Sequence, residues 1–402
     1  MYRNLRVHSD YPRPSELLSK VRVGNIVFEG EMAQDTPGSN LIRRLLLDSD
    51  PRPVYLQAWG GTNTIARALK SIEERYAGTS RWARIQAKVS EKAVILASGF
   101  QDLTYQDYIA PNWPAIRVQN LSDAYGTWGF NCNFTGAGNT RGLPEDEQYF
   151  QGEWIKANIQ IGPLGSLYRS WLDGQTTEGD PLDVFGDPEL APTGWCPPME
   201  PYDFLSEGDN VAFNPLLDTG IQAPEDPTLG GWGGRSVQTT TSPNLWTLAR
   251  TEQDPSGTDI TYTGFPADGP YTTLRWAGDA QRDFAERIQW TLTPRRSDAN
   301  HPPEVSVARG DRAIEVAAGS TVRLRGRATD PDRDGLTYFW WQYREEGTYP
   351  GAVTISGADT ASARVAIPAD AQSGQTISVI LQATDDGDFP LTRYARVILR
   401  VR

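Results

Sequence analysis

The residues best suited to chemistry lie in glycine-marked turns. Glu207 and Asp209 flank a glycine in Glu207-Gly208-Asp209-Asn210, and Asn63 ends the turn Trp59-Gly60-Gly61-Thr62-Asn63. Carboxylate and amide oxygens ligate calcium, and a carboxylate can also activate water. The structural alternative is that the acids only form a solvated turn and that Asn63 only caps a helix.

A second glycine-rich turn carries an aromatic ring and a cation, in Gly230-Gly231-Trp232-Gly233-Gly234-Arg235. Trp232 and Trp59 can each stack on a sugar ring. The chain has 13 Trp, 16 Tyr and 12 Phe, which suits stacking, but core packing uses the same side chains. An ordinary flexible turn is therefore the alternative.

Two further groups of polar residues could bind a ligand or a metal ion. Glu31, Asp35 and Ser39 precede an expected helix, and they either form a polar site or cap that helix. The stretch 330–335 has the alternating acids of a calcium loop, but Trp341 stands where an EF-hand needs its bidentate Glu. Calcium binding in a loop of a β-sandwich stays open.

The elements around the turns predict an α/β fold. Short apolar runs bounded by turn residues indicate buried strands at 53–56 and 93–97, and the spacing of Ile65, Leu69, Ile72 and Tyr76 indicates a helix after the first of them. Helices are also expected around 41–46 and 280–290. Alternating strands and helices favour a parallel sheet, whose ligands bind at the carboxyl ends of the strands.

A Pro-marked boundary at 300–303 separates two regions. We expect an α/β domain over residues 1–299 and an immunoglobulin-like β-sandwich over 300–402, because short alternating strands follow the boundary with turn signals between them. The expected strands are 321–324, 336–342, 363–367, 377–382 and 394–401.

Composition excludes several classes of protein. The formal net charge of −13 argues against nucleic-acid binding, and two His residues leave little room for His-based zinc sites or triads. No apolar run approaches the roughly 18 residues of a membrane span, and residues 1–20 show no secretory signal. No P-loop, GxSxG or CxxC motif occurs. Cys132 and Cys196 can pair or stay free.

The chain as a whole resembles the nucleoside hydrolase-like family that carries a C-terminal immunoglobulin-like domain and is often described as cellulose-binding. The resemblance covers nearly the whole chain in collinear order. It rests on the stretches 57–64, 162–165 with Tyr168, 207–209, 230–235, 283–285, 299–303, 329–343 and 384–387.

The resemblance implies roles for individual residues. The stretch at Asn63 looks like the Gly-Pro-Leu-Thr-Asn turn of nucleoside hydrolases, and Asp209 looks like their late calcium-ligating aspartate. The family also implies secretion or a periplasmic location. Such proteins begin with a strand that ends in clustered aspartates, whereas residues 1–50 contain no Asp-x-x-x-Asp-Asp run. We therefore expect a domain that lacks its first strand, exposed apolar surface on the Val54 or Val94 strand, and an incomplete calcium site.

Two functions follow as expectations. The first is a glycosidase-like hydrolase acting on a ribose-like or other sugar, with calcium at Asp209 and substrate contacts from Asn63 and Glu207. The second is a non-catalytic carbohydrate-binding protein of polysaccharide metabolism, with contacts from Trp59, Trp128, Trp232 and Arg235. We expect Asn63, Asp209 and Trp232 to converge on one pocket and N-glycosidase turnover to be slight or absent. The catalytic residues stay unknown.

Overall fold

The structure is a computed structural model. It describes residues 1–128, 146–176, 200–205, 207–221, 224–240, 242–249, 271–308 and 313–402. Cys132 and Cys196 lie outside these residues.

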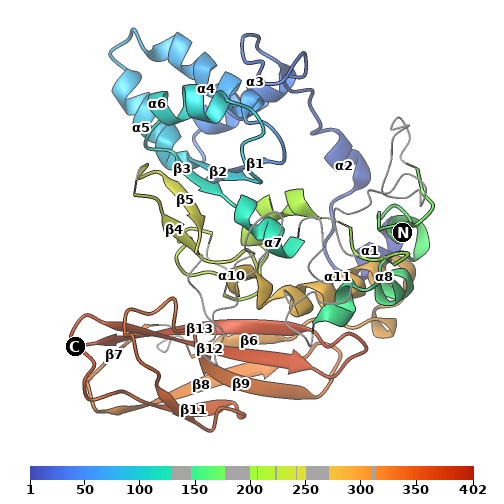
Figure 1. The fold of residues 1–402 in the computed structure, drawn as a ribbon, viewed down its shortest axis with the longest axis vertical. Coiled ribbons are helices and arrows are strands. Elements are labelled where there is room, and N and C mark those ends of the chain that lie inside the picture. The colour runs from blue at the N-terminus through green and yellow to red at the C-terminus, as the bar shows by residue number, and fades with distance from the viewer. Residues whose placement is uncertain are drawn as a thin grey trace.

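A five-stranded sheet organises the first domain (Figure 1). The first four strands in the order β1-β2-β3-β5-β4 run parallel, and β4 pairs antiparallel with β5 at one edge. The parallel α/β fold expected from the sequence is thus confirmed. The strands are β1 (Val54–Ala58), β2 (Ala93–Ala97), β3 (Arg117–Asn120), β4 (Ser236–Gln238) and β5 (Leu245–Leu248).

Alternate side chains of β2 enter two cores on opposite faces of the sheet. Ile95 packs with side chains of α3 (Pro37–Leu47), α4 (Asn63–Tyr76) and α5 (Trp82–Lys92), which cover one face. Val94 joins the core on the other face, which includes side chains of α8 (Gly152–Asn158) and α11 (Ala277–Leu292). Every residue of β2 is buried, so the expectation of exposed apolar surface on the Val94 strand is wrong. Helices cover both faces of this strand, as parallel sheets require.

Shorter helices complete the first domain. They are α1 (Tyr2–His8), α2 (Pro14–Leu18), a π-helical turn (Tyr105–Ile109), α6 (Ala110–Asn112), α7 (Tyr125–Trp128), α9 (Gly162–Gly165) and α10 (Tyr271–Leu274). Single 3₁₀ turns occur at Ser122–Ala124, Glu147–Phe150, Gly208–Ala212, Asn214–Leu216 and Arg296–Asp298. No helix in the described part of the chain combines the length and the apolarity needed to cross a membrane.

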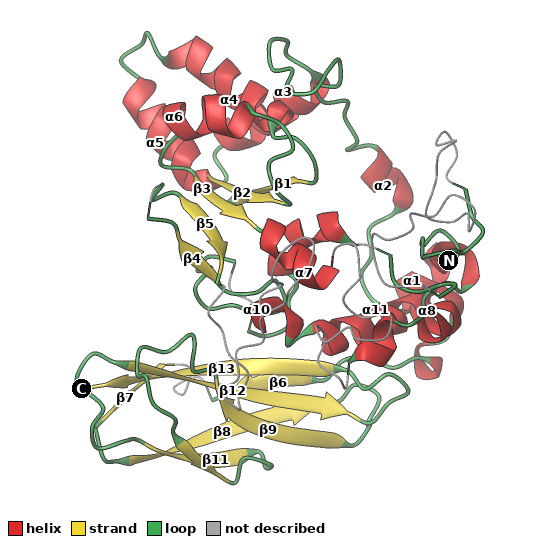
Figure 2. Ribbon diagram, in the orientation of Figure 1, coloured by secondary structure: helices red, strands yellow, loops and turns green. Residues whose placement is uncertain are grey.

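The second domain is a β-sandwich of two four-stranded sheets (Figure 2). One sheet has the order β10-β11-β8-β6 and the other β7-β13-β12-β9. Each strand predicted beyond residue 320 is present. The strands are β6 (Glu304–Val307), β7 (Ala313–Val316), β8 (Thr321–Thr329), β9 (Leu336–Gln342), β10 (Thr354–Ser356), β11 (Ser362–Ala366), β12 (Thr376–Asp385) and β13 (Thr392–Val401).

Helix α11 lies between the parallel sheet and the sandwich (Figure 1). The helix expected over 280–290 is present and is longer than predicted. A separate apolar cluster joins the domains, because Trp232 and Trp276 of the first pack with Tyr343, Ile380 and Tyr394 of the second. The last helix of the first domain ends at Leu292 and β6 begins at Glu304, on either side of the expected boundary.

Candidate functional site

Asn63 is the first residue of α4 and uses its side chain to hold another segment. Its amide Nδ2 donates to the backbone carbonyls of Asn25 (2.9 Å) and Glu31 (3.1 Å). Its backbone N–H donates to Asp102 Oδ2 at 3.0 Å. Asp102, which the sequence did not single out, therefore places a carboxylate at the positive end of the helix dipole. Gly61 is required beside it, because a Cβ there would lie 2.1 Å from Asp102 Oδ2.

The acidic group before α3 is engaged within the protein. Asp35 pairs with Arg67 at 2.8 Å, and Glu31 Oε1 accepts the backbone N–H of Gln34 at 2.9 Å. Ser39 and Thr36 bond each other's backbone N–H in a capping box, so Thr36 and not Asp35 is the cap of α3. This group contributes to the structure around α3.

Trp59 lies directly after β1 and is 50 % exposed. Its Nε1 donates to Gln57 Oε1 at 2.9 Å, which fixes the indole ring at the carboxyl end of the strand. An exposed aromatic ring at this edge offers a flat apolar surface to a sugar.

Asp209 lies against the carboxyl end of β2. Ser98, the residue after this strand, donates from Oγ to Asp209 Oδ1 at 3.1 Å and to the Gly208 carbonyl at 3.1 Å. Calcium needs roughly six to eight oxygen ligands. Among the described residues Asp209 belongs to no cluster of three or more potential metal-ligating side chains. The described surroundings of Asp209 thus do not by themselves make a calcium site, and calcium there stays a prediction.

Glu207 is held by two donors. Tyr168 OH donates to Glu207 Oε1 and Asn210 Nδ2 donates to Oε2, both at 2.6 Å. Burial raises the pKa of the Glu207 carboxyl, and these two hydrogen bonds oppose the rise. Burial and the adjacent Glu207 carboxylate also raise the pKa of Tyr168, which keeps the phenol protonated as a donor.

A cavity of about 260 Å³ lies beside Glu207. Aromatic rings and polar groups share its wall, a combination typical of small-molecule sites. Three polar atoms of lining residues, Trp128 Nε1, Asn210 Oδ1 and Trp232 Nε1, are buried and have no hydrogen-bond partner within the described residues. The lining residues are Trp128, Glu207, Asn210, Phe213, Asn214, Leu217, Trp232, Ala280, Gln281, Asp283, Phe284 and Arg287.

Trp232 contributes to this cavity only with part of its ring. It is 4 % exposed and belongs to the apolar cluster that joins the two domains. The Arg393 guanidinium lies 5.7 Å from the ring centroid. The side chain therefore has a packing role in addition to lining the cavity.

An ion-pair network closes one side of the cavity. Asp283 of α11 pairs with Arg287 of the same helix and, at 2.7 Å, with Arg393 of β13. Burial alone would raise the pKa of Asp283, but the two guanidinium groups outweigh it and lower that pKa. Asp283 therefore stays ionised.

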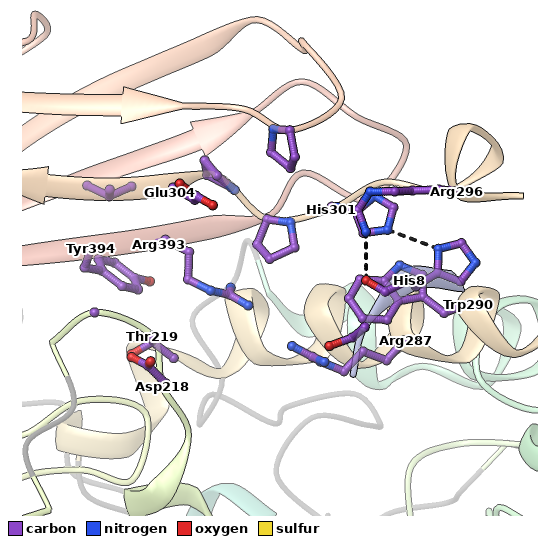
Figure 3. Close-up of a pocket in the computed structure, with 16 residues that line it drawn as sticks. His8, Asp218, Thr219, Arg287, Trp290, Arg296, His301, Glu304, Arg393 and Tyr394 are labelled. Atoms are coloured by element: carbon purple, nitrogen blue, oxygen red, sulfur yellow. Dashed lines mark hydrogen bonds between the residues drawn. The ribbon is translucent and has the colours of Figure 1, made fainter. Parts of the chain in front are cut away.

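A second cavity of about 440 Å³ lies on the far side of Arg287, between α1, α11 and the sandwich (Figure 3). His8 Nδ1 and His301 Nε2 are 3.0 Å apart at its edge, and both rings stack on Trp290. Three arginines, Arg287, Arg296 and Arg393, line it together with the acids Asp218 and Glu304.

The predicted site residues thus divide into two groups. Glu207 and Trp232 line one cavity, together with Trp128. Asn63, Trp59 and Asp209 lie at the carboxyl ends of the strands. Arg235 does not line the cavity beside Glu207, and its backbone N–H donates to Thr272 Oγ1 at 2.6 Å. The segment 207–210 connects the two groups, because Gly208 and Asp209 accept from Ser98 while Glu207 and Asn210 line the cavity.

The family comparisons match both domains. The model described as "Cellulose-binding Sde182, nucleoside hydrolase-like domain" matches residues 1–236. The model described as "Cellulose-binding protein Sde0182, C-terminal domain" matches residues 321–401. The search of curated proteins finds no match.

Among solved structures, a nucleoside hydrolase-related hypothetical protein from Saccharophagus degradans, described as associated with carbohydrate metabolism, is similar over the full chain. It shares 26 % sequence identity with a TM-score of 0.71, and the match covers 100 % of this chain and 85 % of the other. The PKD domain from KIAA 1837 protein is 17 % identical over 24 % of this chain and 86 % of its own, with a TM-score of 0.18. Mouse cadherin-23 EC22-24 is 21 % identical over 26 % of this chain and 33 % of its own, with a TM-score of 0.20. Only the first of these scores is high enough to inform the fold.

Proposed function

Because the chain belongs to the cellulose-binding Sde182 family with a nucleoside hydrolase-like domain, we propose that it binds carbohydrate in the cavity beside Glu207. One observation carries this proposal. The cavity wall combines aromatic side chains with a buried donor, Trp128 Nε1, and a buried acceptor, Asn210 Oδ1, that have no partner among the described residues. A sugar offers hydroxyl groups to satisfy both and C–H faces to pack on the rings.

The size of the cavity limits the ligand. Ligand pockets usually measure roughly 300 to 1,000 Å³, and this one is slightly smaller. It therefore suits a single sugar unit, such as the end of an oligosaccharide or a ribose-like ring, and not the flat face of a polysaccharide crystal. Glu207 is suited to accept hydrogen bonds from sugar hydroxyls, because Tyr168 and Asn210 fix both of its oxygens.

Binding is tested by calorimetric titration of the whole chain with cello-oligosaccharides, ribose and nucleosides. We expect Phe213→Ala, which removes a half-exposed ring from the wall, to weaken binding by roughly 3- to 10-fold, the range for one aromatic contact. Glu207→Gln should weaken it as well, because an amide replaces one acceptor oxygen. Phe339→Ala on the sandwich, which removes a similarly exposed ring outside the cavity, is the matched control.

Two results would contradict the assignment. Unchanged affinity in both cavity variants would exclude the cavity as the binding site. A loss confined to Trp59→Ala would move binding to the carboxyl edge of the sheet, where that ring is exposed.

Hydrolysis is the second candidate, and one observation favours it. The cavity contains Glu207, whose pKa is raised, and Asp283, whose pKa is lowered, and acid–base pairs in hydrolases are often separated in this way. The two arginines that bond Asp283 favour a structural role for that carboxylate. Turnover of aryl glycosides and nucleosides, with and without calcium, decides between the candidates. We expect little or none, and turnover abolished by Glu207→Gln would establish the enzyme.

A further inference from the structure

Three aspartates of the loop between β8 and β9 lie close together. Asp330, Asp332 and Asp334 each offer a carboxylate oxygen within 4.8 Å of the others. Asp330 Oδ1 accepts the backbone N–H groups of Asp332 (2.8 Å) and Asp334 (3.0 Å), which curls the loop around its first carboxylate. Such a cluster alone is common on protein surfaces without any ion.

A buried carboxylate stands at the end of β12, next to the loop that follows this strand. Asp385 is 4 % exposed, and its Oδ1 accepts from Asn300 Nδ2 (2.9 Å) and from the backbone N–H groups of Leu391 (3.0 Å) and Gly387 (3.1 Å). The neighbouring Asp386 Oδ1 accepts the Gly335 N–H at 2.7 Å, so this loop lies directly against the loop of the three aspartates.

Three oxygen atoms at this junction are buried and have no hydrogen-bond partner among the described residues. They are Asp330 Oδ2, Asp385 Oδ2 and Asn300 Oδ1. All three are acceptors, so they cannot satisfy one another, and an unpaired buried polar group destabilises the folded state. The carboxylates of Asp330, Asp332 and Asp334 lie close enough to repel one another when all three are ionised. A cation would satisfy the oxygens and remove the repulsion.

We propose that Asp330, Asp332, Asp334, Asp385 and Asn300 form a Ca²⁺ site at the junction between the sandwich and the preceding linker. Calcium takes roughly six to eight oxygen ligands in flexible geometry, and water can complete the five that these side chains offer. Mg²⁺ demands a stricter octahedron and keeps its water, and zinc prefers nitrogen and sulfur ligands. None of these five residues lines the proposed carbohydrate cavity, and Asp209 is not among them. This site is therefore independent of the proposed function.

The position of Asn300 gives the site its structural consequence. The Asn300 backbone N–H donates to Glu286 Oε1 at 2.9 Å, and its carbonyl accepts from Trp290 Nε1 at 2.8 Å. Both partners belong to α11. In addition, His301 Nδ1 lies 2.9 Å from Asp332 Oδ2, and His301 borders the larger cavity (Figure 3). Calcium bound here would therefore fix the sandwich to the last helix of the first domain.

The test uses the whole chain after removal of divalent ions with EGTA. Calorimetric titration with CaCl₂ should show one bound ion, with a Kd between about 10⁻⁶ and 10⁻³ M, and calcium should raise the melting temperature. MgCl₂ at the same concentration should have a much smaller effect. Absence of both heat and thermal stabilisation at millimolar calcium would overturn the proposal.

Substitutions locate the ion. Asp330→Asn and Asp385→Asn should each weaken calcium binding at least tenfold, because each removes a charge and one of the unpartnered oxygens. Asp359→Asn, an exposed acid in the turn before β11 of the same sandwich, is the matched control and should bind as the wild type does. Wild-type affinity in both site variants would overturn the assignment.

Hydrogen–deuterium exchange of the wild-type chain keeps the test decisive even where a variant fails to fold. Calcium should slow exchange in the peptides that contain 326–337, 383–391 and 298–302. Slowing confined to other segments, such as those around Asp209, would place the ion elsewhere and refute the proposal.

Discussion

The ion pair between Asp283 and Arg393 connects the two domains, and its removal should be costly. Asp283 lies on α11 and Arg393 on β13, and the carboxylate is buried. Removing one partner of a buried pair typically costs about 3 to 5 kcal/mol. Arg287, which also pairs with Asp283, remains in the variant, so we expect Arg393→Met to cost about 2 to 3 kcal/mol. Met keeps most of the apolar stem of the side chain.

Urea unfolding monitored by tryptophan fluorescence at pH 7 measures this cost. Arg400→Met is the matched control, because Arg400 is an exposed arginine on the same strand. The double variant Asp283→Asn, Arg393→Met isolates the pair, since the cycle subtracts the contact of Arg393 with the Trp232 ring. We expect a coupling energy of about 1 to 3 kcal/mol.

The pH dependence of this cost has a definite sign. The folded-state pKa of Asp283 lies below its ordinary value of 3.8, so the stability contributed by the pair is present above that value and is lost as the pH falls through the folded-state pKa. The cost of Arg393→Met should therefore shrink between pH 5 and pH 2. Equal costs for Arg393→Met and Arg400→Met at pH 7, or a cost that stays constant on acidification, would refute the reasoning.

Two further predictions concern the first domain. Gly61→Ala should destabilise the chain by about 1 to 3 kcal/mol, because its Cβ would overlap Asp102 Oδ2, whereas Gly60→Ala, which meets only a side-chain oxygen at 4.0 Å, should cost less than half of that in the same urea assay. Burial raises the pKa of Glu286 from 4.5 to about 8, so the stability that its protonated form contributes is complete below pH 4.5 and is lost as the pH rises through 8. In EGTA, Glu286→Gln should be about 2 to 4 kcal/mol more stable than the wild type at pH 9 and similar to it at pH 4, and a constant difference would contradict this.

The fold was predictable wherever apolar residues form a short run or recur at a regular spacing in the sequence. The run before Trp59 and the run 93–97 are apolar and short, and the structure has β1 and β2 there. The sandwich strands alternate and are separated by turn residues, so they too were found. The pairing of β3 with β5 was not predictable, because it joins residues more than 120 positions apart and leaves no periodic signal.

The site was predictable only in part. Glu207 and Trp232 were found because glycine turns mark them. Asn63 was assigned to a ligand or a cap, but its amide donates to backbone carbonyls, and a backbone acceptor has no signature in the sequence. Asp102 was not singled out, and Asp385 entered only as part of the stretch 384–387 that carries the resemblance, because their roles depend on contacts between distant segments.

Helix α11 contacts both the cavity and the sandwich. One part of its surface lines the cavity beside Glu207 through Gln281 and Phe284, and Asp283 reaches across to the sandwich. The next turn holds Asn300 through Glu286 and Trp290, at the proposed calcium site. Because α11 contacts both parts, we expect movement of the sandwich to change the wall of the cavity. The affinity for carbohydrate should therefore depend on how firmly the sandwich is docked.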